Sequence, residues 1–90
     1  MAGQVWRRSD HVAYVDSDER VVLLDLSRSE DEPRVLSESA SAVWRCIDGR
    51  RTDREIVSAV ADEYDLRPDA VEGDVVAFLA ELVELGLIED

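Results

Sequence analysis

The amino-acid sequence predicts an α+β fold in which a three-stranded antiparallel sheet precedes three helices. Two observations predict this order. Short runs of β-branched and apolar residues before residue 37 are typical of strands, whereas from residue 38 apolar residues recur every three or four positions, as on one face of a helix. The chain has 90 residues, the length of one small domain. We therefore expect a single domain over residues 1–90, with residues 1–9 flexible.

The three expected strands lie within the first 37 residues. Apolar and β-branched residues fill 11–15 and 20–26, and the polar run 16–19 between them predicts a turn. Both faces of the second strand begin apolar, so we expect it to lie at the centre of the sheet and to be covered on both faces. The third strand is expected over 34–37. It follows Pro33, which cannot donate to a ladder, and this favours a position at the sheet edge.

Start and stop signals delimit the three expected helices. The first runs from residue 38 to a natural stop at Gly49. Thr52 and Glu55 have the spacing of a capping box, which predicts the start of the second helix. Pro68 fits the first turn of the third helix, and Gly86 ends it.

The third helix has an unusually wide apolar arc. Five of its residues form a tight group on a helical wheel, and three more extend it: Leu85, Phe78, Val71, Leu82 and Val75, then Leu79, Val83 and Val76. The arc spans about half the circumference, wider than the ~100° of a simple surface helix. Two interpretations follow. The helix is packed on two sides, or part of the arc forms one wall of a binding groove.

Composition excludes several classes of protein. The chain carries 22 Asp and Glu against 10 Arg and no Lys, a formal net charge of −12. Nucleic-acid-binding proteins and proteins that adhere to anionic membranes need clustered cations, so we expect neither partner. Hydrophobic residues make up 46% of the chain, which is enough for a core and argues against disorder.

The residues that usually carry chemistry are scarce. Cys46 is the only cysteine and His11 the only histidine, and they lie 35 positions apart. We expect Cys46 to pack on a helix and His11 to lie on a strand surface, with no metal site, no cofactor and no catalytic residue. Residues 1–8 lack the apolar segment of a secretion signal, and no run reaches the ~18 apolar residues of a membrane span, so a cytoplasmic protein is expected.

Four segments, in the right order over residues 10–88, resemble the PqqD-like family. They are Val22-Leu23-Leu24-Asp25-Leu26, the run from Leu36 to Trp44, the junction Ile47-Asp48-Gly49 with Arg51-Thr52 and Glu55-Ile56, and the pattern Asp74-Val75, Phe78-Leu79, Leu82, Gly86-Leu87-Ile88. The family comprises the precursor-peptide recognition elements of ribosomal peptide natural-product pathways. Its fold is a winged helix-turn-helix arrangement with the sheet placed first, which agrees with the predicted order of elements.

The resemblance implies a function and a site. Family members hold the leader segment of a precursor peptide and present it to a modifying enzyme or leader peptidase. The leader adds as a strand beside the third strand, and its apolar side chains enter a cleft against the third helix. Carried over to this sequence, the edge comprises Arg34, Val35 and Leu36, and the wall comprises Val71, Asp74, Val75 and Phe78. Asp74 would either bind a leader cation or N–H, or remain an ordinary solvated carboxylate.

This chain departs from the family pattern where the leader would dock. Members usually have glycine in the turn before the third strand and an aromatic residue at the position of Arg34. Here the loop 27–33 is longer and acidic. Acid therefore flanks the expected docking zone, and we expect a cationic ligand or partner whose association weakens with salt.

Two alternatives to leader binding remain open, and the sequence favours the second of them over the first. A DNA-binding winged helix needs a basic recognition helix, yet residues 52–90 carry twelve acids and two Arg. A generic adaptor subunit of an enzyme complex, which binds no peptide, fits the composition as well as leader binding does. The wide apolar arc of the third helix would also allow two copies to pair.

Overall fold

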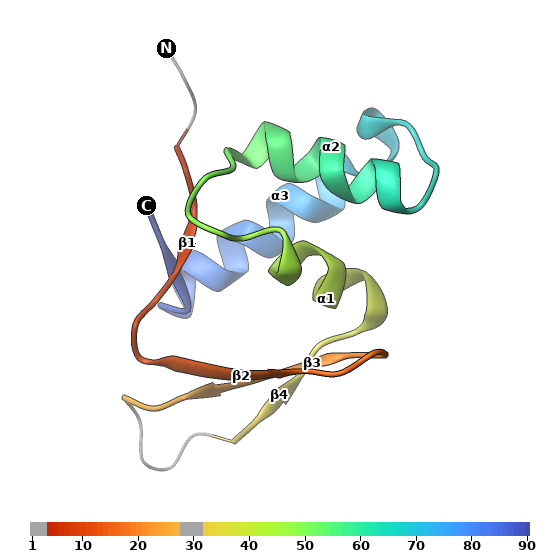
Figure 1. Ribbon diagram of the computed structural model, residues 1–90. Helices are drawn as coiled ribbons and strands as arrows, with labels where there is room; N and C mark the ends of the chain where they lie inside the picture. Colours follow the sequence, from red (N-terminus) through yellow and green to blue (C-terminus); the bar gives the residue numbers. More distant parts are fainter. Residues whose placement is uncertain (1–3, 28–31) are drawn as a thin grey trace.

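The computed structural model describes residues 4–27 and 32–90. In chain order its elements are β1 (Arg7–Arg8), β2 (Val12–Asp16), β3 (Val21–Asp25), β4 (Arg34–Val35), α1 (Glu38–Arg45), α2 (Asp53–Glu63), α3 (Pro68–Glu84) and β5 (Ile88–Glu89). The three helices lie on one side of the sheet formed by β2, β3 and β4 (Figure 1). The predicted fold class, a three-stranded antiparallel sheet followed by three helices, is confirmed.

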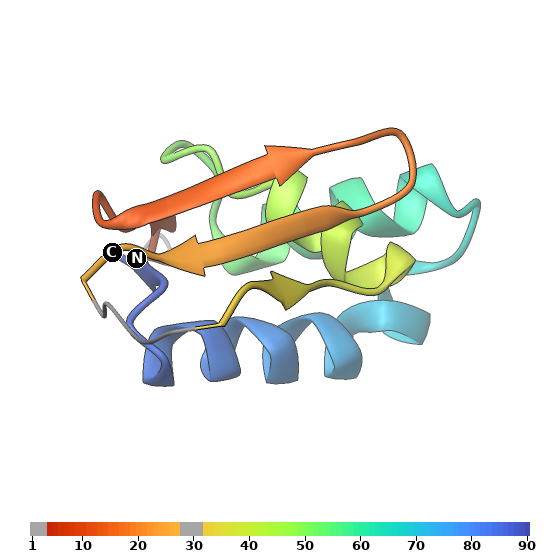
Figure 2. The ribbon, with the colours of Figure 1, turned by 90° about the horizontal axis from the view of Figure 1, so that it is seen from below.

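The strand order β2-β3-β4 places the most apolar strand at the centre. Val21 and Leu23 on β3 are fully buried beneath the helices, whereas the alternating Val22 and Leu24 point to the opposite face and are only half-buried. The expectation of a central second strand and an edge third strand is therefore correct, whereas cover on both faces is wrong, because all three helices pack on the same side of the sheet. Strand β4 is the edge next to α3, and β2 is the edge away from it (Figure 2).

The helix boundaries follow the signals in the sequence. Thr52 and Glu55 form both hydrogen bonds of the capping box, and Pro68 occupies the first turn of α3. Gly49 and Gly86 have φ angles of +80° and +75°, values that favour glycine after a helix. The starts at Thr52 and Pro68 and the stop at Gly86 are confirmed. The stop expected at Gly49 is wrong, because α1 ends at Arg45: the N–H groups of Cys46 and Ile47 donate to carbonyls three residues earlier, which closes a tight last turn before Gly49 is reached.

The core lies between the sheet and the helices, and α1 supplies its largest side chain, the fully buried Trp44. The predicted apolar faces of the first two helices are buried there. For the third helix, the buried part is smaller than its apolar arc predicts. Val76 and Val83 are 44% and 42% exposed, so the part of α3 that neighbours cover is narrower than its apolar arc.

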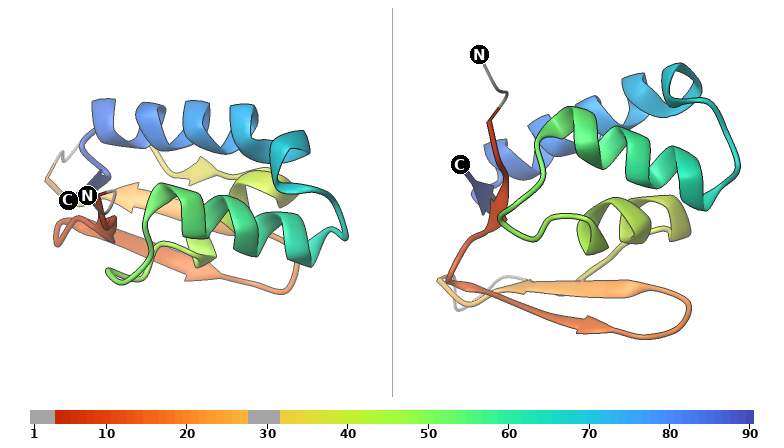
Figure 3. Two further views of the ribbon diagram at one scale, coloured as in Figure 1. Left: turned by 90° about the horizontal axis from the view of Figure 1, so that it is seen from above. Right: turned by 45° about the horizontal axis from the view of Figure 1, so that its top comes forward.

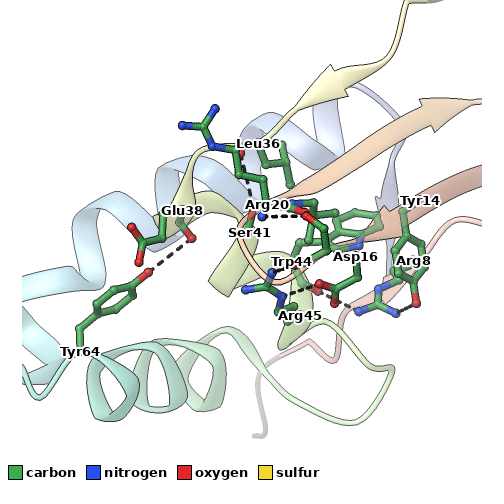
Figure 4. A network of polar contacts seen from close by, with 12 residues as sticks. Arg8, Tyr14, Asp16, Arg20, Leu36, Glu38, Ser41, Trp44, Arg45 and Tyr64 are labelled. Carbon is green, nitrogen blue, oxygen red and sulfur yellow. Dashed lines mark hydrogen bonds and ion pairs between the residues drawn. The ribbon is translucent and has the colours of Figure 1, made fainter.

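The flexibility expected for residues 1–9 stays a prediction; residues 1–3 lie outside the described part of the chain, and Arg7–Arg8 form strand β1. Strand β1 pairs antiparallel with β5 at the opposite end of the sequence (Figure 3). An ion pair of 3.2 Å joins Arg7 to Glu89. The guanidinium of Arg8 lies over the rings of Tyr14 and Trp44, 4.6 and 5.2 Å from their centroids (Figure 4). These contacts tie the N-terminal segment to the core.

A buried hydrogen bond joins α1 to the central strand and gives a first prediction. The Oγ of Ser41, a fully buried residue, accepts the backbone N–H of Val21 at 2.8 Å. In Ser41→Ala this donor loses its acceptor, so we expect the free energy of unfolding to fall by about 1–3 kcal/mol in urea denaturation. Ser39→Ala, at an exposed position of the same helix, is the control and should change it by less than ~0.5 kcal/mol. Equal effects of the two substitutions would contradict this assignment.

Candidate functional site

The outer edge of β4 carries free main-chain groups. The N–H of Leu36 donates to the carbonyl of Val21 at 2.9 Å, and Val35 stands opposite Val22. Because main-chain groups alternate in direction along a strand, the N–H and C=O of Val35 point away from β3. Among the described residues no strand pairs with β4 on that side. Val35 thus presents one donor and one acceptor to an incoming strand.

The three residues predicted for this edge have different environments. Arg34 stands opposite Leu23 and so lies on the helix side of the sheet, where it is exposed. Val35 lies on the other face and is 61% exposed. Leu36 is 8% exposed, belongs to the core and has its N–H bonded within the sheet. Arg34 and Val35 are therefore accessible to a ligand, whereas Leu36 supports the fold.

An apolar cleft of about 490 Å³ opens beside α3. It is lined by α1, the end of α2, the loop that follows and the first half of α3: Ser39, Ala40, Val43, Val60, Tyr64, Leu66, Ala70, Val71, Asp74, Val75 and Phe78. All four residues predicted for the helix wall are in this set. The cleft includes the start of α1, which follows β4 by three residues, and α3 itself lies next to β4 (Figure 2).

Seven cleft residues were not predicted as site residues from the sequence: Ser39, Ala40, Val43, Val60, Tyr64, Leu66 and Ala70. Ser39 and Ala70 are small residues that leave room rather than fill it, and no periodicity marks such positions. Tyr64 stands at the end of α2 and is only partly buried. Leu66 carried a usable signal: it is a large apolar residue in a polar connection, and it is 52% exposed.

Acidic groups surround one end of the cleft. The hydroxyl of Tyr64 donates to the carbonyl oxygen of Glu38 at 3.4 Å (Figure 4). Burial, assisted by the carboxylates of Glu38 and Glu63, raises the pKa of Tyr64, so its hydroxyl stays protonated and able to donate. A second hollow shares Tyr64 with the cleft and is lined by Asp18, Glu19, Arg20, Glu38, Arg45 and Glu63.

One of the two cations of this hollow is already neutralised. The Nε of Arg45 binds the carboxylate of Asp16 at 3.0 Å, and the same guanidinium donates to the carbonyl of Ser17. The four carboxylates of the hollow therefore exceed the free positive charge. This end of the cleft favours cationic groups of a ligand.

The residues that might have carried catalysis are placed apart from the cleft. Burial raises the pKa of the Cys46 thiol, which keeps it protonated at neutral pH. The Nε2 of His11 lies 3.0 Å from the carbonyl oxygen of Gly86 and takes part in holding the C-terminal segment. Within residues 4–27 and 32–90 no three His, Cys, Asp or Glu side chains gather as a metal site would require, and no helix is long and apolar enough to cross a membrane.

The fold and the site together define a class of protein. It is a winged-helix-like domain with a free strand edge beside an apolar cleft. The chain belongs to the family of coenzyme PQQ synthesis protein D (PqqD), whose family model matches residues 20–88. No protein of curated function matches the chain significantly.

Solved structures resemble the chain over nearly its full length. TbiB1 in complex with the TbiA(beta) leader peptide is 31% identical, with a TM-score of 0.78 over 92% of this chain and 94% of that one. The PqqD part of Methylobacterium extorquens PqqCD, described as a stand-alone recognition element for ribosomally synthesized and post-translationally modified peptides, is 26% identical, with a TM-score of 0.71 over 99% and 96%. Lasso peptide synthetase B1, complexed with its leader peptide, is 20% identical and shares the fold, with a TM-score of 0.76 over 97% and 100%.

Proposed function

We propose that this protein binds the leader segment of a ribosomally made precursor peptide and presents it to a modifying enzyme or leader peptidase, without itself catalysing a reaction. The observation that carries the proposal is the outward-facing N–H and C=O of Val35 on an edge strand, next to an apolar cleft. The leader adds as a fourth strand to β4, and its apolar side chains enter the cleft against Val71, Val75 and Phe78. Because ribosomes make the precursor in the cytoplasm, we place the protein there.

The strand edge and the cleft make different contributions to binding, and both follow from their chemistry. Main-chain hydrogen bonds to Val35 are independent of ligand sequence, so they contribute affinity for any extended segment. Specificity then comes from the cleft, whose apolar lining accepts large apolar side chains. The TbiB1 complex supports this proposal because it contains a leader peptide and its protein is 31% identical to this chain.

Asp74, an exposed carboxylate that lines the cleft, gives a second prediction, which concerns charge. Asp74→Asn should weaken binding of a leader with a cationic residue by about two- to fivefold at ~0.1 M salt, and the difference should shrink at ~0.5 M salt as charges are screened. Fluorescence polarisation of a labelled synthetic leader peptide measures both. Glu72→Gln, on the same helix but outside the cleft, is the matched control. Affinity that does not depend on salt in the wild-type protein would reduce the acidity to an aid to solubility.

The same titration tests the proposed function itself. The peptide is the leader of a short precursor reading frame, to be identified in the neighbourhood of the gene for this protein, and a scrambled peptide of equal composition is the control. We expect saturable binding of the leader and much weaker binding of the scrambled sequence. Absence of leader binding by the wild-type protein would favour the adaptor function, in which the protein contacts only an enzyme.

A further inference from the structure

The sheet has an apolar outer face, opposite the helices, that no described element covers (Figure 1). Cross-strand pairing places Val15, Val22 and Val35 in one row over all three strands, with Ala13 beside Leu24 in the next row. We call these five residues the outer face. Val15 is 67% and Val35 61% exposed.

The composition of the outer face contrasts with that of the chain, which has 22 acidic residues. The two carboxylates of β2 and β3 both lie on the helix side: Asp16 pairs with Arg45, and Asp25 is 6% exposed. The described strands therefore direct no carboxylate to the outer face. The patch is small, so its assignment as an interaction surface depends on its continuity with the leader-binding edge as well as on its apolar character.

A second copy of the chain fits this surface poorly. Strands ~4.8 Å apart with a rise of ~3.3 Å per residue give the outer face a footprint on the order of 200 Å². A stable interface needs about 800 Å² from each partner, so any protein that docks here also contacts the surroundings of the outer face. For a second copy, that remaining area would bring together two chains that each carry a formal net charge of −12 and repel each other.

The outer face is continuous with the proposed leader-binding edge, because Val35 belongs to both. A leader strand added to β4 widens the same sheet and exposes every second side chain on this side. A protein seated on the outer face would thus contact the sheet and the bound leader together. We propose that the outer face is the docking surface for the enzyme that acts on the leader-bearing peptide, which presents an apolar patch with a cationic rim. This inference rests on the proposed function.

The test uses Val15→Asp, which places a carboxylate on the β2 side of the outer face, away from the leader-binding edge, at a largely exposed position. Val83→Asp is the matched control, since it adds the same charge at an exposed valine on α3, outside the cleft. The probes are the labelled leader peptide and the purified modifying enzyme or leader peptidase encoded beside the protein. With leader present, we expect Val15→Asp to bind the enzyme at least about tenfold more weakly, with leader affinity changed less than about twofold. Val83→Asp should match the wild type in both assays.

Three outcomes would overturn the inference. The first is that Val15→Asp binds the enzyme as tightly as the wild type does. The second is that the leader-loaded wild type shows no enzyme binding at all. Sedimentation analysis showing a wild-type dimer that Val15→Asp dissociates would assign the outer face to a second copy. Failure of the proposed function gives a different result from these three outcomes. In that case the wild-type protein does not bind the leader, whether or not it binds the enzyme.

Discussion

Replacing Val35 with proline is expected to weaken leader binding by about tenfold while leaving the fold intact. The substitution removes the one N–H that β4 directs outward, and a main-chain hydrogen bond contributes roughly 1 kcal/mol net. The proline ring also occupies the place where the partner carbonyl would approach. The bond from Leu36 to Val21, which holds β4 in the sheet, does not involve this N–H and remains.

Val35→Ala separates the main-chain effect from the side-chain effect. Alanine keeps the N–H and removes only side-chain atoms on the outer face, so we expect leader affinity within about threefold of wild type. Thermal unfolding of both variants checks that the sheet persists. If Val35→Pro binds the leader as well as Val35→Ala does, strand addition at β4 is wrong, whatever the cleft contributes.

Truncation of Phe78 is expected to have the second largest effect on binding. Phe78 is partly buried against the core and lines the cleft, so it offers a leader the largest apolar surface on that wall. We expect Phe78→Ala to lower leader affinity by about tenfold or more, as loss of a buried aromatic anchor does. The titration is read below the unfolding temperature, because the variant also loses part of the ~3–5 kcal/mol that a fully buried phenylalanine contributes.

Two further variants make the result for Phe78 specific. Phe78→Leu keeps an apolar side chain of similar reach and should retain more of both stability and affinity. Val83→Ala shortens an exposed valine outside the cleft and should leave leader affinity unchanged. Wild-type affinity in a folded Phe78→Ala protein would exclude this wall from the binding site.

The signals that correctly predicted the fold are local ones. The capping box of Thr52 and Glu55, the proline at the start of α3 and the glycine after its end each act within a few residues, so the sequence displays them directly. The central position of β3 was predicted correctly, but the cover expected on both of its faces is present only on the helix side. The pairing of β1 with β5 could not be predicted, since each strand has only two residues and the two strands lie at opposite ends of the sequence.

The candidate site was predictable in part. The apolar arc of α3 correctly included Val71, Val75 and Phe78, which line the cleft, but it also included Val76 and Val83, which are exposed. A helical wheel gives the direction of each side chain and not the width of the neighbours that cover it. The contribution of Tyr64 and of the small cleft residues depends on how α1, α2 and α3 meet, which no single segment contains.

Hydrogen exchange of the Val35 amide tests strand addition most directly. In the free protein this N–H has no partner in the sheet, so it should exchange rapidly, whereas the N–H of Leu36 is bonded and slower. Saturating leader peptide should slow exchange at Val35 by at least about tenfold, measured residue by residue by NMR. Leader that binds without slowing exchange at Val35 would contradict docking at the β4 edge.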